Sequence, residues 1–248
     1  MRQPAPKRSR DLSLLQLIPN LLTIGAICAG LTAIRFAVQG SFQFAVALIV
    51  LAAVLDGLDG RLARLLKTSS ELGAELDSLA DFLNFGVAPP LIIYFWALQD
   101  ARSAGWIAVL IFAVCCVMRL ARFNVGSRAP DGGEKTGFIG VPSPAAGLLV
   151  LLPLYLARLD PLLAPPALVT GLWLVFVGFL MIGRFPTPSL KGARVGRETV
   201  RFVVLGFVAL VAFLATYPWA TLTVCAALYL GLLARDGLMR RIARRKEE

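Results

Sequence analysis

Eight stretches of the 248-residue sequence are apolar over most of a membrane-spanning length. A spanning helix needs about 20 mostly apolar residues, because the hydrocarbon core of a bilayer is about 30 Å thick. The stretches lie near residues 14–38, 42–60, 76–98, 104–124, 142–158, 165–183, 200–217 and 219–235. Only 16% of the residues are charged, whereas soluble domains average about 25%. The pattern predicts an all-α polytopic membrane protein with about eight transmembrane helices.

The basic residues are distributed unevenly between the connections. The sequence has 25 Lys and Arg against 15 Asp and Glu, and 22 of the 25 fall in the two terminal segments and the second, fourth and sixth loops. Lys and Arg accumulate in cytoplasmic loops, so both termini are predicted to be cytoplasmic. We expect a basic N-terminal segment at 1–13, one transmembrane catalytic domain at 14–235 and a basic tail at 236–248. The positive charge then indicates the inner face of a cell membrane and its lipids, and not nucleic acid.

Four aspartates lie at the predicted cytoplasmic ends of the second and third spans. Asp56 and Asp59 are three residues apart and Asp77 and Asp81 are four apart, so each pair lies on one face of its helix. An aspartate at the centre of a spanning helix costs about 2.5–3.5 kcal/mol, which makes such residues candidates for function. A short connection between the two spans predicts that the pairs face each other. Pairing with interfacial basic residues would account for one or two of the aspartates, but not for four.

The chemistry open to these aspartates is narrowed by the absence of histidine from the sequence. Four neighbouring carboxylates repel one another unless cations neutralise them. Oxygen ligands favour Mg²⁺, Mn²⁺ or Ca²⁺, and two such ions would balance four negative charges. Paired metal ions are also a recurring device for holding phosphate during a displacement. A general base in this chain has to be a carboxylate or another group that is not imidazole.

The segment Asp56–Asp81 resembles the signature of the CDP-alcohol phosphotransferases. It matches the pattern D-x2-D-G-x2-A-R-x8-G-x3-D-x3-D at every fixed position. Members of that family are membrane enzymes that join two alcohols through a phosphodiester and release CMP. The resemblance implies the fold of that family and a homodimer. It also implies dependence on divalent cations, namely two Mg²⁺ or Mn²⁺ ions, with Ca²⁺ as another occupant.

The resemblance also implies a role for individual residues. Asp56, Asp59 and Asp77 would bind metal, and Asp81 would be a further ligand and the catalytic general base. The CDP portion of the lipid donor would be held by Asp56 and by six other residues. These are Asn20, Thr23, Gly60, Arg64, Ser70 and Gly73.

Three further stretches resemble the serine-using members of the family, the membrane-spanning phosphatidylserine synthases. They are Pro19-Asn20 with Thr23, the segment 77–89, and the pair of segments 119–124 and 137–146. The implied substrates are CDP-diacylglycerol and L-serine. An amino-acid acceptor requires a cation for its carboxylate, so Arg119, Arg122 and Lys135 are candidates for binding the acceptor or phosphate. The charge of Lys135 is equally consistent with an ordinary cytoplasmic loop.

Two other functions are compatible with parts of the sequence. The same chemistry could use another acceptor, such as glycerol 3-phosphate, choline or inositol, or an archaeal ether-lipid donor. Buried acids also mark ion pathways, so an ion-coupled transporter is a more distant alternative. A transporter is expected to have interrupted helices in two related halves, whereas these acids are confined to two adjacent spans.

Overall fold

The computed structural model describes residues 14–66, 70–128, 140–183 and 197–247, and all secondary structure within these ranges is helical. Each of the eight predicted stretches is helical over most of its described part. The predicted N-terminal segment 1–13 lies outside the described residues. In chain order the helices are α1 (Leu14–Val38), α2 (Phe42–Leu65), α3 (Glu71–Asp81), η1 (Phe82–Val87), α4 (Ala88–Ile93), η2 (Tyr94–Leu98), α5 (Arg102–Arg128), α6 (Ser143–Val150), α7 (Leu152–Leu159), η3 (Pro161–Leu163), α8 (Ala167–Ile182), α9 (Arg197–Thr216) and α10 (Pro218–Glu247).

Within the described residues, five helical segments are long and apolar enough to cross a membrane. They are Ile18–Val38, Phe42–Leu65, Leu72–Leu98, Ser103–Gly126 and Pro218–Gly237. The other three predicted spans correspond to shorter apolar helices, namely Ser143–Leu159, Ala167–Ile182 and Val204–Thr216. The structure therefore supports a multi-pass helical membrane protein, and a total of eight spans stays a prediction.

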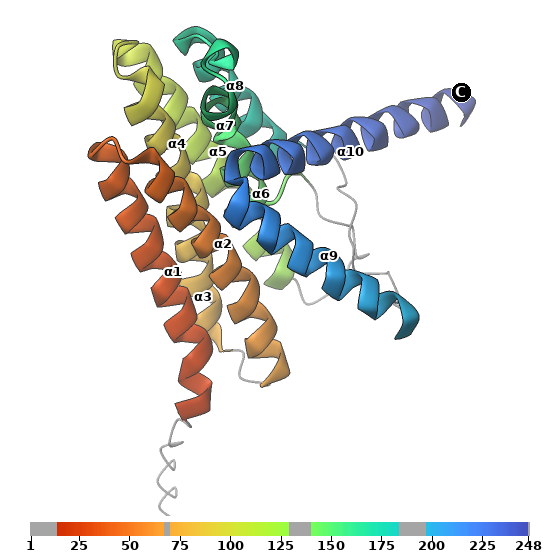
Figure 1. The fold of residues 1–248 in the computed structure, drawn as a ribbon. Coiled ribbons are helices and arrows are strands. Elements are labelled where there is room, and N and C mark those ends of the chain that lie inside the picture. The colour runs from red at the N-terminus through yellow and green to blue at the C-terminus, as the bar shows by residue number, and fades with distance from the viewer. Residues whose placement is uncertain (1–13, 67–69, 129–139, 184–196, 248) are drawn as a thin grey trace, which may run out of the picture.

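Small residues bring α1 and α2 close together. The buried face of α1 carries alanines at intervals of three or four residues, including Ala26, Ala29 and Ala33, and α2 presents buried Ala45 and Ala52. Small side chains allow two helix backbones to approach closely, which is how many membrane helices associate. The two helices run side by side in Figure 1, and the start of α3 packs against α1. This arrangement places the ends of all three helices together.

The third predicted span is a continuous but irregular helix. The α-helical segments α3 and α4 alternate with two π-helical segments, η1 and η2. Pro89 and Pro90 lack the N–H groups that would bond to carbonyls four residues earlier, and this accounts for the irregular backbone of η1. The prediction of a helix over 76–98 is confirmed, and two parts of that helix are π-helical.

A proline also divides the fifth predicted span. Pro153 lacks the N–H that would bond to the Leu149 carbonyl, and the chain breaks into α6 and α7 nearby. The indole Nε1 of Trp173, in α8, donates to that carbonyl at 2.9 Å. The free backbone group is thus satisfied within the bundle, as a membrane interior requires. The main core lies between α5, α8 and their neighbours, around buried Phe112 and Leu174.

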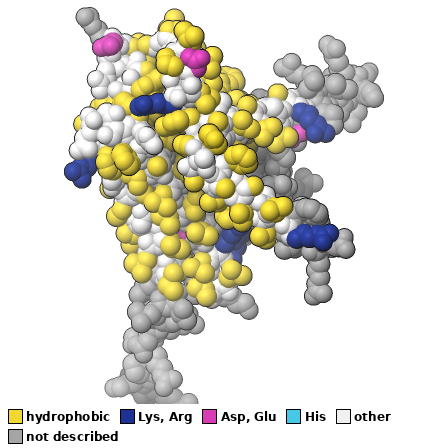
Figure 2. Space-filling view, in the orientation of Figure 1, with side chains coloured by type: hydrophobic (Ala, Val, Ile, Leu, Met, Phe, Trp, Pro, Cys, Tyr) yellow, Lys and Arg dark blue, Asp and Glu magenta, His cyan; other side chains and the backbone are white. Residues whose placement is uncertain are grey.

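The last two helices extend away from the rest of the bundle in Figure 1. The start of α10 packs against α7, and α10 continues through Glu247 without a break at the predicted end of the last span. Large apolar side chains such as Phe207 and Phe213 of α9 are exposed. The face drawn in Figure 2 is mostly hydrophobic, with few charged side chains along the helices. Such a surface is suited to contact with lipid.

Candidate active site

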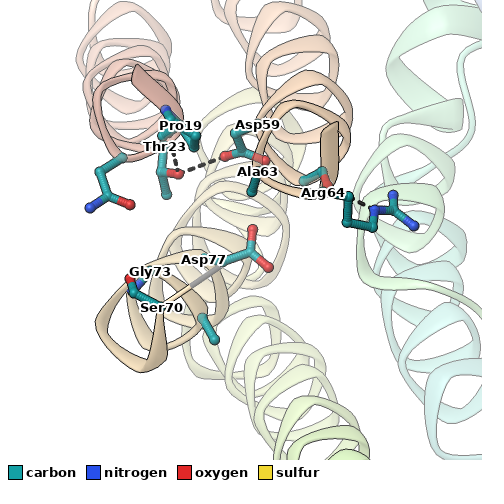
Figure 3. A pocket seen from close by; sticks show the side chains of 11 residues that line it. Pro19, Thr23, Asp59, Ala63, Arg64, Ser70, Gly73 and Asp77 are labelled. Carbon is teal, nitrogen blue, oxygen red and sulfur yellow. Dashed lines mark hydrogen bonds between the residues drawn. The ribbon is translucent and has the colours of Figure 1, made fainter. Parts of the chain in front are cut away.

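Three of the four predicted aspartates form a compact carboxylate cluster. One carboxylate oxygen from each of Asp56, Asp59 and Asp77 lies within 4.8 Å of the other two. Asp56 and Asp59 project from the last turns of α2, and Asp77 projects from α3. Figure 3 shows Asp59 and Asp77 pointing toward the space between these helices. The predicted convergence of the two aspartate pairs is therefore found at this end of the bundle.

Asp81 adjoins the cluster at its inner side. Its carboxyl group is within hydrogen-bonding reach of the Asp56 carboxyl group. The Oδ1 atom of Asp81 is buried and has no hydrogen-bond partner among the described residues. Two carboxyl groups at such close range must share a proton or a cation. Asp81 is thus placed to exchange a proton beside the other three carboxylates.

The cluster has the donor set that a divalent cation prefers. All of its candidate ligand atoms are carboxylate oxygens, the ligands of hard ions such as Mg²⁺, Mn²⁺ and Ca²⁺. The Oδ1 atom of Asp59 is also buried without a partner in the part of the chain that the structure describes. Buried carboxylate oxygens without hydrogen-bond donors are costly unless a cation compensates them. These residues can therefore bind a divalent cation.

A cavity of about 160 Å³ opens beside the carboxylate cluster, between the start of α1, the end of α2 and the start of α3. Seven residues were predicted to hold the CDP group, and all of them except Asp56 line this cavity. Asp59 and Asp77 of the cluster line it as well. The complete lining is Pro19, Asn20, Thr23, Asp59, Gly60, Ala63, Arg64, Ser70, Gly73, Ala74 and Asp77. Asp56 lies in the carboxylate cluster and not in this lining.

The first turn of α3 shapes one wall of the cavity. Ser70 is the N-cap of α3, and its hydroxyl accepts a hydrogen bond from the Gly73 backbone N–H at 3.0 Å. A side-chain carbon on Gly73 would lie 3.1 Å from both Asn20 Oδ1 and Ser70 Oγ. Glycine at this position therefore keeps the wall open. On the opposite wall, Arg64 Nε donates to the Gly60 carbonyl at 2.8 Å and the side chain is exposed.

Thr23 contacts the carboxylate cluster directly. Its hydroxyl donates to Asp59 Oδ2 at 2.6 Å and also lies 3.1 Å from the Pro19 carbonyl oxygen. Both Thr23 and Asp59 are buried. A hydrogen bond to a ligating carboxylate fixes its orientation, as groups behind metal ligands commonly do. Sequence reasoning missed this contact because 36 residues separate the two positions.

A second contact that the sequence did not reveal fixes α3 against α5. Asn124 Nδ2 donates to Ser78 Oγ at 3.0 Å, and the Ser78 hydroxyl lies 3.3 Å from Asn124 Oδ1. Ser78 lies between Asp77 and Asp81 in the sequence. The contact therefore holds the segment that carries two of the aspartates. Asn124 belonged to a recognised motif, but its partner could not be read from that motif.

The predicted acceptor-binding residues have different surroundings. Arg119 is buried, its Nη1 donates to Ser143 Oγ at 2.6 Å, and its guanidinium interacts electrostatically with Asp81. Arg122 is exposed, and its Nη1 donates to the Ile182 carbonyl at 3.1 Å, at the end of α8. Lys135 lies outside the described residues. Of these three, the structure directs Arg119 toward the aspartates, whereas Arg122 caps a helix end.

Comparisons with known proteins bear on the family of the chain. A family model described as CDP-alcohol phosphatidyltransferase matches residues 16–182, and one described as CDP-alcohol phosphatidyltransferase 2 matches 198–233. The CDP-diacylglycerol–serine O-phosphatidyltransferase of Mycobacterium leprae is 48% identical over 148 residues, which cover 58% of this chain and 48% of that protein. The protein of the same name from Helicobacter pylori J99 is 38% identical over 218 residues, covering 87% of this chain and 89% of that protein.

The chain spans about half the length of the mycobacterial relatives that it matches. The first family model covers more than half of the chain, from within α1 to the end of α8. It includes all four aspartates and every described residue that lines the cavity. By the extent of this match, and by the aspartate signature at its centre, the chain belongs to the CDP-alcohol phosphatidyltransferase family.

Proposed function

We propose that this chain transfers the phosphatidyl group of CDP-diacylglycerol to the hydroxyl of L-serine and releases CMP. The observation that carries the proposal is the alignment of 87% of the chain with a relative that bears this activity in its name. The aspartate cluster beside a cavity supports it, because the chemistry needs anionic ligands and a base next to a bound nucleotide.

The reaction proceeds by direct displacement at phosphorus. The serine hydroxyl is a weak nucleophile at neutral pH, so a carboxylate must take its proton as it attacks. Asp81 is the proposed base, because it adjoins the cluster and is within hydrogen-bonding reach of Asp56. The bond from the serine oxygen to phosphorus forms, the bond from phosphorus to the CMP oxygen breaks, and the proton goes to the Asp81 carboxylate.

The donor would bind in the cavity at the start of α1. Asn20, Ser70 and Arg64 offer polar groups to the CDP portion, and Gly60 and Gly73 leave room for close approach. Asp56, Asp59 and Asp77, with Asp81 as a further ligand, would hold two Mg²⁺ or Mn²⁺ ions, a site that Ca²⁺ could also occupy. Such cations supply neutralisation of the phosphate charge and stabilise the leaving group.

The proposed topology has eight spans with both termini and the active site on the cytoplasmic face of the inner membrane. The excess of Lys and Arg in the terminal segments and even loops supports it. Reporter fusions at each terminus test the orientation, and a periplasmic signal from either would contradict it. We also propose a homodimer, which the mass of the purified protein in detergent, corrected for bound detergent, can test.

The activity is tested with purified protein in detergent, CDP-diacylglycerol and Mg²⁺ or Mn²⁺. We expect CMP release that depends on L-serine and stops when EDTA removes the cation. The panel of other acceptors is glycerol 3-phosphate, choline and inositol. Release with one of these instead of serine would overturn the acceptor but not the transfer chemistry, and an archaeal ether-lipid donor tests the lipid part in the same way. Absence of CMP release with every acceptor in the presence of donor and cation would contradict the chemistry itself.

A further inference from the structure

A buried polar pair lies outside the nucleotide cavity. Arg119 of α5 is 8% exposed and Ser143 of α6 is fully buried, and 2.6 Å separate Arg119 Nη1 from Ser143 Oγ. Neither residue lines the cavity beside the carboxylate cluster. A buried guanidinium is costly unless hydrogen bonds and opposite charge compensate it. Burial of this charged pair is therefore unlike that of an ordinary core contact and points to a role in function.

Ser143 is held in place by its backbone. Gly140 has a φ of 84°, and a side-chain carbon there would lie 2.4 Å from the Met181 carbonyl oxygen. The Val141 N–H donates to the Leu180 carbonyl at 3.2 Å. The segment leading into α6 is thus fixed against the end of α8. Helix capping does not use the Ser143 hydroxyl, because Pro142 is the N-cap residue of α6. This hydroxyl accepts the hydrogen bond from Arg119 and also contacts the Cys116 thiol.

The guanidinium of Arg119 interacts electrostatically with groups on two other helices. Arg119 interacts electrostatically with Asp81 of α3 and with Tyr229 of α10. The guanidinium also lies 5.8 Å from the centre of the Phe123 ring. The Tyr229 hydroxyl oxygen is buried and has no hydrogen-bond partner among the described residues. A planar guanidinium and a nearby hydroxyl are a suitable pair of donors for a carboxylate.

The geometry points to Ser143 as a positioning residue that aims Arg119 at the carboxylate of the acceptor amino acid, with Tyr229 as a second donor. The inference rests on the proposed function. In serine only two carbon atoms separate the hydroxyl oxygen from the carboxylate carbon. A base for the hydroxyl and a cation for the carboxylate must therefore act close together, and the charges of Asp81 and Arg119 interact electrostatically. The same pair would select amino acids over uncharged alcohols.

The test measures KM and kcat for Ser143→Ala with each substrate varied in turn. We expect the KM for L-serine to rise about tenfold, as loss of a hydrogen bond to a charged group predicts, with the KM for CDP-diacylglycerol unchanged. Ser143→Thr keeps the hydroxyl and is expected to restore the KM for serine to within about threefold of the wild type. Tyr229→Phe, which removes a single oxygen atom, should raise the same KM by about threefold.

Thr170→Ala is the matched control, because it removes another fully buried hydroxyl, at the distant end of α8. It should leave both KM values unchanged. If the KM for serine is unchanged in both Ser143→Ala and Tyr229→Phe, the inference is overturned. The proposed function still holds in that case, provided that the wild-type protein uses serine. An equal rise in both KM values for Ser143→Ala overturns it too, since that indicates general damage. Wild-type use of an uncharged alcohol in place of serine overturns both.

Discussion

The hydrogen bond from Thr23 to Asp59 gives a quantitative prediction about cation binding. The hydroxyl donates to Asp59 Oδ2 at 2.6 Å, both residues are buried, and the second carboxylate oxygen, Oδ1, has no hydrogen-bond partner among the described residues. Thr23→Val keeps the shape of the side chain but removes this donor. A hydrogen bond to a charged group contributes about 1.5–3 kcal/mol, and loss of groups behind metal ligands commonly costs about 10–100-fold in affinity.

We therefore expect Thr23→Val to raise the Mg²⁺ concentration for half-maximal activity by about 10–100-fold, equivalent to ~1.4–2.8 kcal/mol. The assay is CMP release at saturating CDP-diacylglycerol and L-serine, titrated with Mg²⁺ and separately with Mn²⁺. Thr23→Ser keeps the hydroxyl and should behave as the wild type. Thr32→Val is the matched control, because its hydroxyl donates only to the Cys28 carbonyl, at 2.6 Å in the same helix.

Two results would refute this reasoning. The first is a half-maximal Mg²⁺ concentration for Thr23→Val within about twofold of the control, which would show that the hydrogen bond contributes less than ~0.4 kcal/mol to cation binding. The second is a rise in the KM for CDP-diacylglycerol with no change in the cation dependence. That outcome would return Thr23 to the nucleotide-binding role that the family resemblance implies.

Three further substitutions test the site and its packing. Asp81→Asn should retain CDP-diacylglycerol binding but lower kcat by about 10²–10⁴-fold, and normal turnover would remove Asp81 as the base. Gly73→Val should raise the KM for CDP-diacylglycerol by about tenfold by narrowing the cavity, so an unchanged KM would place the nucleotide elsewhere. Gly86→Ala places a carbon 2.9 Å from Cys116 Sγ and should lower the free energy of unfolding by about 1–3 kcal/mol. Gly206→Ala is the control, because a carbon there has no neighbouring atom within 4 Å. Thermal unfolding in detergent compares the two variants, and equal melting temperatures would contradict the packing argument.

The membrane class and the aspartate pairs were predictable because both are local properties of the sequence. The length of an apolar run determines whether a helix can cross a bilayer, and this requires no tertiary information. The spacings of Asp56 with Asp59 and of Asp77 with Asp81 place each pair on one helix face for the same reason. The short connection between the helices then made the convergence of the pairs predictable. The irregular and broken helices could not be predicted from apolar run length, because prolines change the local hydrogen bonding without shortening the run.

The tertiary structure alone decided which side chains support the aspartates. Thr23 bonds to Asp59 across 36 residues, Asn124 to Ser78 across 46, and Arg119 to Ser143 across 24. Such contacts depend on how helices rotate and pack against one another, which periodicity within a single helix does not specify. The same packing distinguished Arg119, which is buried, from the exposed Arg122 one turn later. The sequence by itself therefore determined a membrane protein with an acidic site, and the packing of its helices decided how that site is oriented.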